Sequence, residues 1–294
     1  MSNRVLVTGA TGNVGRAVVG ALLRRGLRVR AASSDPVRLR ASCDPNVEAV
    51  RLDFWDAASF PEAVADCDGL FLMRPPPIAQ VRRTLLPLIA AARGAGVRHV
   101  VFLSVQGAER NRFIPHHTVE QALRAGAGGY TLLRPGFFAQ NLAEAYQKDI
   151  AVDARLYVPA GTGRVAFVDT RDIAEVAALC LADATSHDRQ AYTLTGAQAL
   201  SFHEVAALLT RALARPIRYE PASVLGYARH LRKHGAPMPQ VAVLCALHVG
   251  IRFGQAAHID PTLGRLLGAP PRSLEAYIAE HRALWAPLAS GPKK

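Results

Sequence analysis

A short apolar run followed by three evenly spaced glycines stands almost at the start of the chain. Val5–Val7 is apolar, and Gly9, Gly12 and Gly15 follow at intervals of three, before an apolar pattern with helical spacing. This order predicts a strand, a tight turn and a helix. At the carboxyl edge of a parallel sheet, such a turn presents backbone N–H groups and the positive end of a helix, which together bind a pyrophosphate.

The three glycines have separate expected roles. One adopts a turn conformation that a Cβ would strain, one lets a phosphate approach, and one lets the helix pack on the strand. We predict dinucleotide contacts along the whole turn, from Gly9, Thr11, Gly12, Asn13, Val14 and Gly15.

The first half of the chain alternates apolar strands with helical patterns. The predicted strands are Val5–Val7, Arg28–Ala32, Val47–Leu52, Gly69–Met73, His99–Leu103 and Tyr130–Leu133. The predicted helices between them include Val14–Arg25, Ile78–Arg93 and Pro115–Ala125. Apolar strands separated by helices indicate a parallel sheet that is buried on both faces. The fold class expected is α/β, a doubly wound Rossmann sheet.

After about Phe138 the rhythm changes. Further strands are predicted at Val165–Val168, Tyr192–Thr195 and Ile217–Glu220, with helices at Asp172–Leu181 and Val205–Leu213. Ser201–Glu204 reads as a capping box. We therefore expect a Rossmann domain over 1–140, completed by segments near 165–195, and a smaller mixed α/β lobe, mainly helical, over 141–290. The tail Gly291–Lys294 is expected to be disordered.

Composition narrows the class of protein. The chain has 294 residues, 50% of them hydrophobic, yet no window of about 18 uninterrupted apolar residues marks a membrane span. The first strand begins too early for a signal peptide to precede it. The four cysteines are far apart and show no CxxC spacing. They are typical of reduced thiols in a cytoplasmic protein, and we expect no metal site.

The net charge of +12 allows two interpretations, a nucleic-acid-binding surface or a basic surface on an arginine-rich protein. The basic residues are scattered and not interleaved with aromatic ones, which favours the second. The densest run, Arg229–His234, is expected to form a solvated helix face. We expect a small-molecule substrate, no nucleic acid or membrane partner, and a monomer or homodimer.

Several motifs together identify a family. They are Thr8–Gly15, Leu52–Asp56, Phe102–Ser104, His116–Glu120, Tyr130–Asn141, Val168–Ala174 and Tyr192–Gly196. With them the chain resembles, over residues 4–285, the NmrA-like branch of the atypical short-chain dehydrogenase/reductases. That branch includes NAD(P)H:quinone oxidoreductases, triphenylmethane reductase, the isoflavone-reductase group and a regulator that binds dinucleotide without catalysis.

The resemblance implies cofactor contacts after the third and fourth strands. Asp53, followed by Phe54, would contact the adenine, although an aspartate before a helix also bonds backbone N–H groups. Met73, Arg74 and Pro75 would pass over the nicotinamide ribose. Arg74 then pairs with a cofactor phosphate or an acidic substrate, or is a solvated loop arginine.

The end of the second strand decides between NAD and NADP, because an acidic residue holds the ribose 2′-hydroxyl and an arginine accepts a 2′-phosphate. The family often places arginine where Ser34 stands. Ser33 and Ser34 with Arg38 or Arg40 would bind the 2′-phosphate of NADP, whereas Asp35 favours NAD. We expect NADP and keep NAD open.

The expected catalytic residues depart from the orthodox pattern of serine followed by Tyr-x-x-x-Lys. Ser104 fits the serine position and also lies beside the expected cofactor. Counting back from Glu120 puts His116 at the lysine position and Arg112 at the tyrosine position, so the proton-donor pair is absent. His116 would hold the nicotinamide ribose or donate a proton near pH 7, or is a polar residue at a helix start.

The resemblance also implies contacts after the sixth strand. Pro135, Gly136 and Phe137 would flank the nicotinamide amide. Phe137 and Phe138 would wall the substrate cleft, although such an aromatic pair is often simply core. Asn141 would line the pocket and bond a substrate carbonyl.

These observations predict an NAD(P)H-dependent reductase that transfers hydride to a quinone, an enone or a similar conjugated molecule. Two alternatives stay open. The missing Tyr-x-x-x-Lys pair suits a regulator that senses the dinucleotide without catalysis, and the fold also suits a cofactor-assisted epimerase or isomerase.

Overall fold

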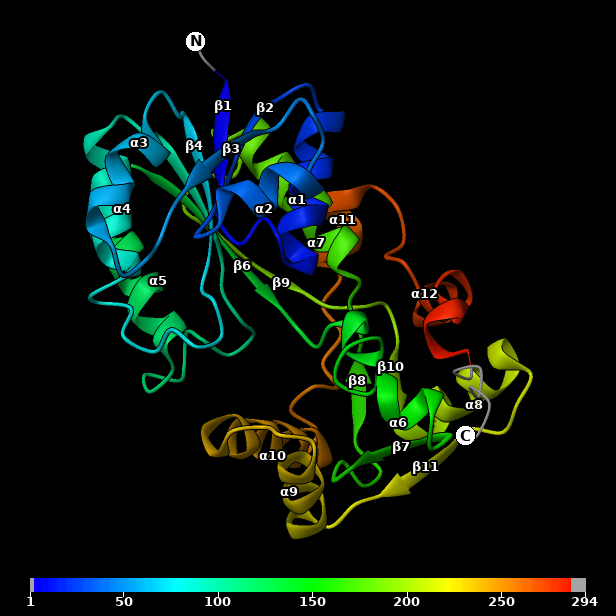
Figure 1. Cartoon of the computed structure of the whole chain (residues 1–294). Helices are drawn as coiled ribbons and strands as arrows, with labels where there is room; N and C mark the ends of the chain where they lie inside the picture. The colour runs from blue at the N-terminus through cyan, green and yellow to red at the C-terminus, as the bar shows by residue number, and fades with distance from the viewer. Residues whose placement is uncertain (1–2, 287–294) are drawn as a thin grey trace. The chain divides into compact units, whose positions relative to one another are not determined.

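The computed structural model describes residues 3–286, so the expected disorder of Gly291–Lys294 lies outside the described residues. The chain forms two compact units (Figure 1). The sheet unit contains residues 3–135, 170–194 and 262–269, and the lobe unit contains 136–169, 195–261 and 270–286.

The sheet unit is built on seven strands in the order β3-β2-β1-β4-β5-β6-β9, and every neighbouring pair is parallel. The strands are β1 (Arg4–Val7), β2 (Arg28–Ser33), β3 (Glu48–Arg51), β4 (Gly69–Met73), β5 (His99–Leu103), β6 (Gly129–Pro135) and β9 (Gln190–Leu194). The doubly wound Rossmann sheet is therefore confirmed. Because β2 and β4 lie on opposite sides of β1, the strand order reverses there, and ligands of such sheets bind at this reversal.

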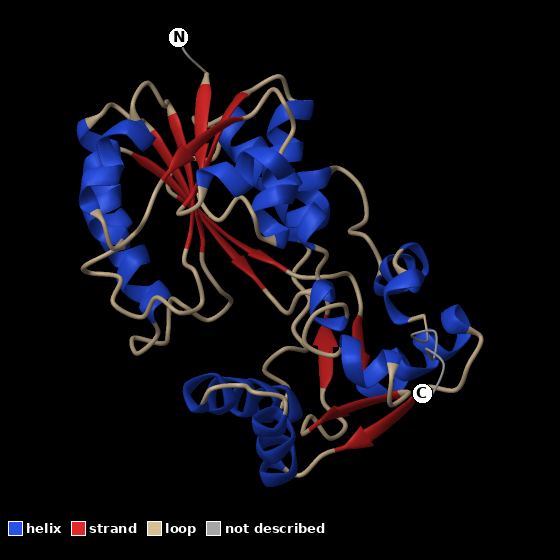
Figure 2. Cartoon of the chain, in the orientation of Figure 1, coloured by secondary structure: helices blue, strands red, loops and turns tan. Residues whose placement is uncertain are grey.

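Helices cover both faces of the sheet (Figure 2). They are α1 (Asn13–Arg24), α2 (Pro36–Ser42), η1 (Ala57–Ser59), α3 (Phe60–Val64), α4 (Leu85–Gly94), α5 (Pro115–Ala125), α7 (Thr170–Ala182) and α11 (Thr262–Leu267). In Figure 1, α3, α4 and α5 lie on one face and α1, α7 and α11 on the other. Phe60, Leu88 and Leu123 bring the first group into one apolar core, whose burial drives folding.

The prediction of a helix over Ile78–Arg93 is wrong at its start, because α4 begins only at Leu85. Pro87 explains the difference. A proline inside a helix lacks the N–H that would bond the previous turn, but it is tolerated within the first turn. The residues before Leu85 form turns instead, and one of these turns is closed by a hydrogen bond from Ile78 N to Pro75 O at 2.9 Å.

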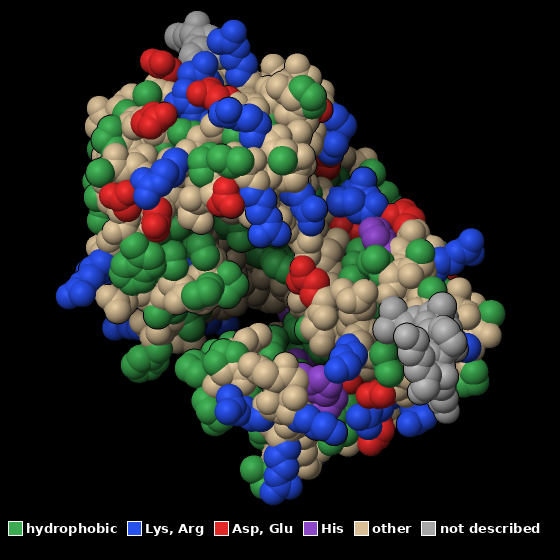
Figure 3. Space-filling model, in the orientation of Figure 1, with side chains coloured by type: hydrophobic (Ala, Val, Ile, Leu, Met, Phe, Trp, Pro, Cys, Tyr) green, Lys and Arg blue, Asp and Glu red, His purple; other side chains and the backbone are tan. Residues whose placement is uncertain are grey.

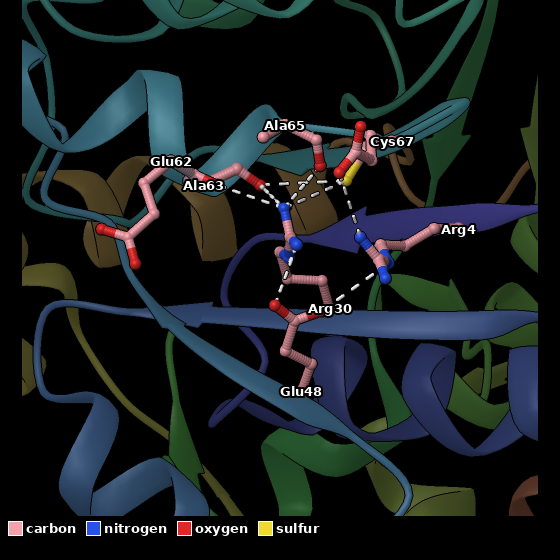
Figure 4. Close-up of polar contacts among 8 residues, drawn as sticks. Arg4, Arg30, Glu48, Glu62, Ala63, Ala65 and Cys67 are labelled. Carbon is pink, nitrogen blue, oxygen red and sulfur yellow. Dashed lines mark hydrogen bonds and ion pairs between the residues drawn. The ribbon is translucent and has the colours of Figure 1, made fainter. Parts of the chain in front are cut away.

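A buried arginine interrupts the apolar pattern of β2. Arg30 is only 6% exposed. Its Nη1 donates to the carbonyls of Ala63 and Ala65 at the end of α3, and its Nη2 pairs with Glu48 at 2.8 Å. Figure 4 shows the guanidinium between these two groups, with Cys67 beside it. Glu48 thus compensates the buried charge of Arg30, and the guanidinium donates to carbonyls at the end of α3 that the helix leaves unpaired.

The lobe unit contains two short sheets and several helices. β7 (Arg155–Val158) pairs in parallel with β11 (Arg218–Pro221), and β8 (Arg164–Ala166) pairs antiparallel with β10 (Ala199–Ser201). The helices are η2 (Ala139–Leu142), α6 (Gln147–Ala151), α8 (Phe202–Leu213), α9 (Val224–Lys233), α10 (Met238–Arg252), α12 (Leu274–Glu280) and η3 (Arg282–Trp285). The predicted capping box is confirmed, since Ser201 and Glu204 bond each other's backbone N–H at the start of α8.

Candidate functional site

The turn after β1 needs glycine at two positions for its own packing. Gly9 has φ of +65°, and a Cβ on it would lie 2.3 Å from Met73 Sδ. A Cβ on Gly15 would lie 2.0 Å from the carbonyl oxygen of Gly9. These glycines let β1, β4 and α1 approach each other at the switch point.

Gly12 differs from its two neighbours in the motif. Its φ is −85°, and an added Cβ would meet nothing nearer than Gly9 O at 3.4 Å, which is ordinary contact. Packing within the protein therefore leaves room for a side chain there. Among the described residues no side chain caps α1, and its first turn holds no acidic residue. An open helix N-terminus with a bare approach fits a diphosphate.

The other residues predicted in the turn lie around this opening. Thr11 is exposed and Asn13 is half-buried. The Val14 side chain is buried in the core, which leaves only its backbone for a ligand.

Thr8, which was absent from the predicted contacts, joins the ends of β1 and β4. Its hydroxyl donates to Phe71 O at 3.2 Å and accepts from Met73 N at 2.9 Å. Met73 and the residues after it are thus held opposite the glycine turn. The Thr-Gly pair at the end of the strand is the sequence signal for this pair of hydrogen bonds between β1 and β4.

At the end of β2, the carboxylate of Asp35 already accepts a hydrogen bond from the backbone. Asp35 Oδ1 accepts from Arg38 N at 3.0 Å as the N-cap of α2, and Ser33 Oγ accepts from Asp35 N at 3.1 Å. Ser34 and Arg38 are exposed. Within the described part of the chain, the Arg38 guanidinium has no hydrogen-bond or ion-pair partner. A hydroxyl and a free guanidinium are the groups that a 2′-phosphate needs.

Asp53 occupies the place expected after β3, and its Oδ1 accepts from Trp55 N at 2.9 Å. Asp53 thus bonds a backbone N–H group, which is the alternative to an adenine contact that the sequence left open. The Phe54 side chain is 8% exposed and belongs to the core. Asp56 is the N-cap of η1, and its carboxylate accepts a hydrogen bond from Ala58 N.

Arg74 follows β4 and contacts His116 on α5. Its Nε donates to His116 Nε2 at 3.4 Å. Its Nη1 donates to the carbonyls of Pro75, Pro76 and Ile78 at 3.1, 2.9 and 2.8 Å. Arg74 is therefore a fixed, half-buried cation, which differs from a solvated loop arginine.

Burial, together with the nearby charge of Arg74, lowers the pKa of His116 to about 4. The ring is neutral at pH 7, so it has no imidazolium proton to give there. Hydrogen bonding, rather than proton donation, is the role that this environment favours.

Ser104 is buried in an ionic network. Its hydroxyl donates to Glu120 Oε1 at 2.6 Å, and Arg134 Nε donates to the same oxygen at 2.9 Å. Burial raises the pKa of Glu120, but hydrogen bonds from Arg134 and Ser104 outweigh it and lower the pKa below its usual value. Because Ser104 is 1% exposed and its proton points at a carboxylate, it has no proton to offer a substrate in this conformation.

Sequence reasoning used Glu120 only to count positions and missed this network. The available signal was a pair of opposite charges, Glu120 and Arg134, at buried positions of a helix and a strand.

The residues predicted around the nicotinamide and substrate divide between the two units. Pro135 ends β6 in the sheet unit, and Gly136 begins the lobe unit. Phe137 is 8% exposed and packs edge-on against Phe167 at 5.6 Å between ring centroids. Phe138 and Asn141 are half-buried, and the Asn141 side-chain amide has no partner within residues 3–286.

A buried tyrosine–histidine pair in the lobe unit was also missed. Tyr146 donates its hydroxyl to His248 Nε2 at 2.6 Å, while His248 Nδ1 donates to Leu244 O at 2.7 Å. Burial lowers the pKa of His248 to about 4 and raises that of Tyr146. The two residues are 102 positions apart, so no local pattern signals their contact.

Three further findings bear on the class of site. The described residues contain no group of three or more His, Cys, Asp or Glu side chains arranged to hold a metal ion. None of the helices in the described part is long and apolar enough to cross a membrane. On the face in Figure 3, Lys and Arg side chains are spread among other types and do not form one patch.

Comparison with known proteins gives relatives of similar length. The chain is 34% identical over 291 residues to the (4-alkanoyl-5-oxo-2,5-dihydrofuran-3-yl)methyl phosphate reductase of Streptomyces griseus, covering 96% of this chain and 99% of that one. It is 31% identical over 287 residues to the NAD(P)H azoreductase of Xenophilus azovorans, covering 95% and 98%.

A solved structure of an oxidoreductase is also similar to this chain. The NADPH-dependent quinone oxidoreductase 2 of Escherichia coli, complexed with NADPH, matches with a TM-score of 0.84 and 26% identity over 95% of this chain and 99% of that chain. The model of the NmrA-like family matches residues 1–269. With a match over most of its length, this chain belongs to the NmrA-like family.

Proposed function

We propose that this chain is an NADP(H)-dependent reductase that transfers hydride to a quinone, an enone or a similar conjugated small molecule. The observation that carries the proposal is Gly12, which the protein's own packing does not require to be glycine. A bare approach to an uncapped helix N-terminus serves a ligand, and a diphosphate suits it best. The relatives named as NAD(P)H azoreductase and quinone oxidoreductase support an oxidoreductase.

In this proposal, the Rossmann domain over residues 1–140, completed by segments near 165–195, holds the cofactor. The acceptor binds to Phe137, Phe138 and the lobe over 141–290, of which 287–290 lie outside the described part. The diphosphate binds the turn Gly9–Gly15, and Ser34 with Arg38 bind the 2′-phosphate. Phe137 and Phe138 offer an apolar surface and Asn141 a side-chain amide to the acceptor. The bound cofactor supplies the hydride, and the protein orients it and excludes water.

We also place the protein in the cytoplasm, as a monomer or homodimer. Its four cysteines are free, which suits a reducing compartment. The scattered basic residues support a small-molecule substrate over a nucleic acid.

The test is NADPH oxidation by the purified protein with a series of quinones and enones, compared with the Gly12→Asp variant. Aspartate is a favoured N-cap, so this variant is expected to keep α1 and the fold intact while its carboxylate repels the diphosphate. Acceptor-dependent NADPH oxidation that disappears in Gly12→Asp supports the proposal. Tight NADPH binding without turnover of any acceptor would favour the sensing regulator instead.

A further inference from the structure

An open groove of about 520 Å³ lies between two loop segments at the carboxyl edge of the sheet. One wall comes from residues 79–83, in the loop between β4 and α4. The other wall comes from residues 113–118, which end the loop after β5 and begin α5. Both walls belong to the sheet unit. The volume of the groove falls within the range of about 300–1,000 Å³ that is usual for small-molecule sites.

The first wall is an ordered turn that carries two arginines. Val81 is 3% exposed and anchors the turn in the apolar core. Gln80 O accepts hydrogen bonds from Arg83 N at 3.0 Å and from Thr84 Oγ1 at 2.9 Å. Arg82 and Arg83 are exposed, and neither guanidinium has an ion-pair or hydrogen-bond partner within residues 3–286. Two free guanidinium groups are thus carried on a fixed backbone beside the groove.

The second wall presents an aromatic ring to solvent. The Phe113 side chain is 98% exposed, although its backbone is held in a turn in which Phe113 N donates to Asn111 Oδ1 at 3.0 Å. Covering an exposed aromatic ring with an apolar surface is favourable. An ordered turn that holds a bare ring at the edge of a groove therefore favours a ligand with a planar, apolar part.

The charges around the groove have one sign. No Asp or Glu is found among the described residues that line it. The N-terminus of α5 also meets the groove, since Pro115 and Thr118 line it. In the described structure no side chain caps this helix and its first turn holds no acidic residue, so the positive end of the helix dipole adds to the two arginine charges. The ligand that complements this groove carries a negative charge.

The groove lies on the side of the sheet where the nicotinamide is expected. Its first wall belongs to the loop that begins with Arg74, and its second wall contains Pro115, the residue before His116. Arg74 Nε donates to His116 Nε2 at 3.4 Å, so this contact joins the segments that form the two walls. The cofactor phosphates are assigned to the ends of β1 and β2, and β4 separates β1 from β5. An anion in the groove is therefore distinct from those phosphates.

We propose that this groove binds the acceptor through an anionic group, a carboxylate, sulfonate or phosphate, attached to a planar ring. Arg82 and Arg83 attract the charge, and Phe113 packs against the ring. Because both guanidinium groups are solvated, they select by their summed charge, and each contributes modestly. This inference rests on the proposed function and narrows its substrate class to acceptors with a negative charge.

The experiment compares two acceptors that share a ring system and differ in charge, 1,4-naphthoquinone-2-sulfonate and 1,4-naphthoquinone. KM and kcat with NADPH are measured for the wild type and for the double variant Arg82→Gln with Arg83→Gln. The control is the double variant Arg28→Gln with Arg124→Gln, which removes two exposed arginines at the start of β2 and in the last turn of α5. We expect the groove variant to raise KM for the sulfonate about tenfold, with kcat and the neutral quinone little changed. The control variant should change neither acceptor.

Two further readouts separate charge recognition from a structural role. Salt screens exposed charges, so KM of the wild type for the sulfonate should rise with added NaCl, and the groove variant should lose this dependence. Phe113→Ser should also raise KM for the sulfonate without changing the melting temperature, because the ring is almost fully exposed. Equal changes in KM for the sulfonate and the neutral quinone, or equal effects of the groove and control variants, would overturn the proposal.

Calorimetric titration of naphthalene-2-sulfonate, which accepts no hydride, distinguishes the groove from the proposed function. The wild type is expected to bind this probe, and the double variant Arg82→Gln with Arg83→Gln is expected to bind it about tenfold more weakly. A protein that binds the probe in this way but reduces no acceptor contradicts the proposed function and not the anion site. Equal affinity of the wild type and the groove variant, or no binding to the wild type, overturns the anion site.

Discussion

A Cβ placed on Gly15 would lie 2.0 Å from the carbonyl oxygen of Gly9. The backbone of Gly15, in the first turn of α1, is therefore packed directly against the backbone of Gly9, in the turn after β1. We predict that Gly15→Ala lowers the free energy of unfolding by about 3 kcal/mol, because neither backbone can yield without moving α1.

Denaturant unfolding measures this change. Gly94→Ala is the control, since a Cβ on Gly94 meets nothing within 4 Å, and it should leave stability unchanged or slightly higher. Equal stability of Gly15→Ala and the wild type would contradict the packing described for the turn.

The buried ion pair of Glu120 and Arg134 gives a second prediction. Glu120→Gln leaves the Arg134 charge without its bidentate partner, and we expect a loss of about 3 kcal/mol in unfolding free energy. Arg211 and Glu275 form an ion pair with both side chains more than half exposed, at 62% and 68%. Glu275→Gln should therefore change stability by less than about 1 kcal/mol. Similar effects of the two substitutions, measured by thermal unfolding, would argue against the buried network.

The pH dependence of stability follows from buried histidines. Burial lowers the pKa of His99, His116 and His248 to about 4. The unfolded chain, with histidines at their usual pKa of about 6.5, binds more protons in this window, so stability falls as pH drops from about 6.5 to 4. Each histidine contributes up to about 1.4 kcal/mol per pH unit to that slope. His99→Gln should make the slope shallower, and an unchanged slope would be inconsistent with a neutral, buried His99.

The Tyr146–His248 pair in the lobe unit is open to a direct test. Tyr146→Phe leaves His248 Nε2 buried without a donor, and this should lower stability by about 1–3 kcal/mol. Tyr157→Phe also removes one hydroxyl, but from a half-buried ring with no hydrogen bond within the described residues, and should have a smaller effect. The same urea titration serves both variants, and a neutral Tyr146→Phe would speak against the hydrogen bond.

Cofactor preference is predicted to depend on Arg38. Arg38→Ala removes the free guanidinium near the end of β2 and should weaken NADPH binding about tenfold while leaving NADH binding unchanged. Arg28→Ala, which removes an exposed arginine at the opposite end of β2, serves as the charge control. Should both cofactors lose affinity equally, Arg38 would not be reading the 2′-phosphate.

Local patterns were sufficient to predict much of this fold. The glycine turn, the six apolar strands and the capping box at Ser201–Glu204 each depend on residues close in sequence, and each is present. The exact match of α5, Pro115–Ala125, reflects a proline at a position that starts helices.

Features that depend on distant residues were not predictable in the same way. The apolar pattern from Ile78 onward predicts a longer helix than α4, which begins only at Leu85, because Pro87 fits a helix only within its first turn. The Ser104–Glu120–Arg134 network and the Tyr146–His248 pair join separate elements, and their partners are fixed only when the chain has folded. The contact of Arg74 with His116 likewise spans 42 residues.

Calorimetric titration of NADPH into the wild-type protein and Gly12→Asp tests most directly whether the turn after β1 holds a dinucleotide. We predict saturable binding to the wild type and none to Gly12→Asp, with both proteins unfolding at similar temperatures. Equal NADPH affinity in the two proteins, or no binding of NADPH or NADH to the wild type, would contradict the proposed cofactor site.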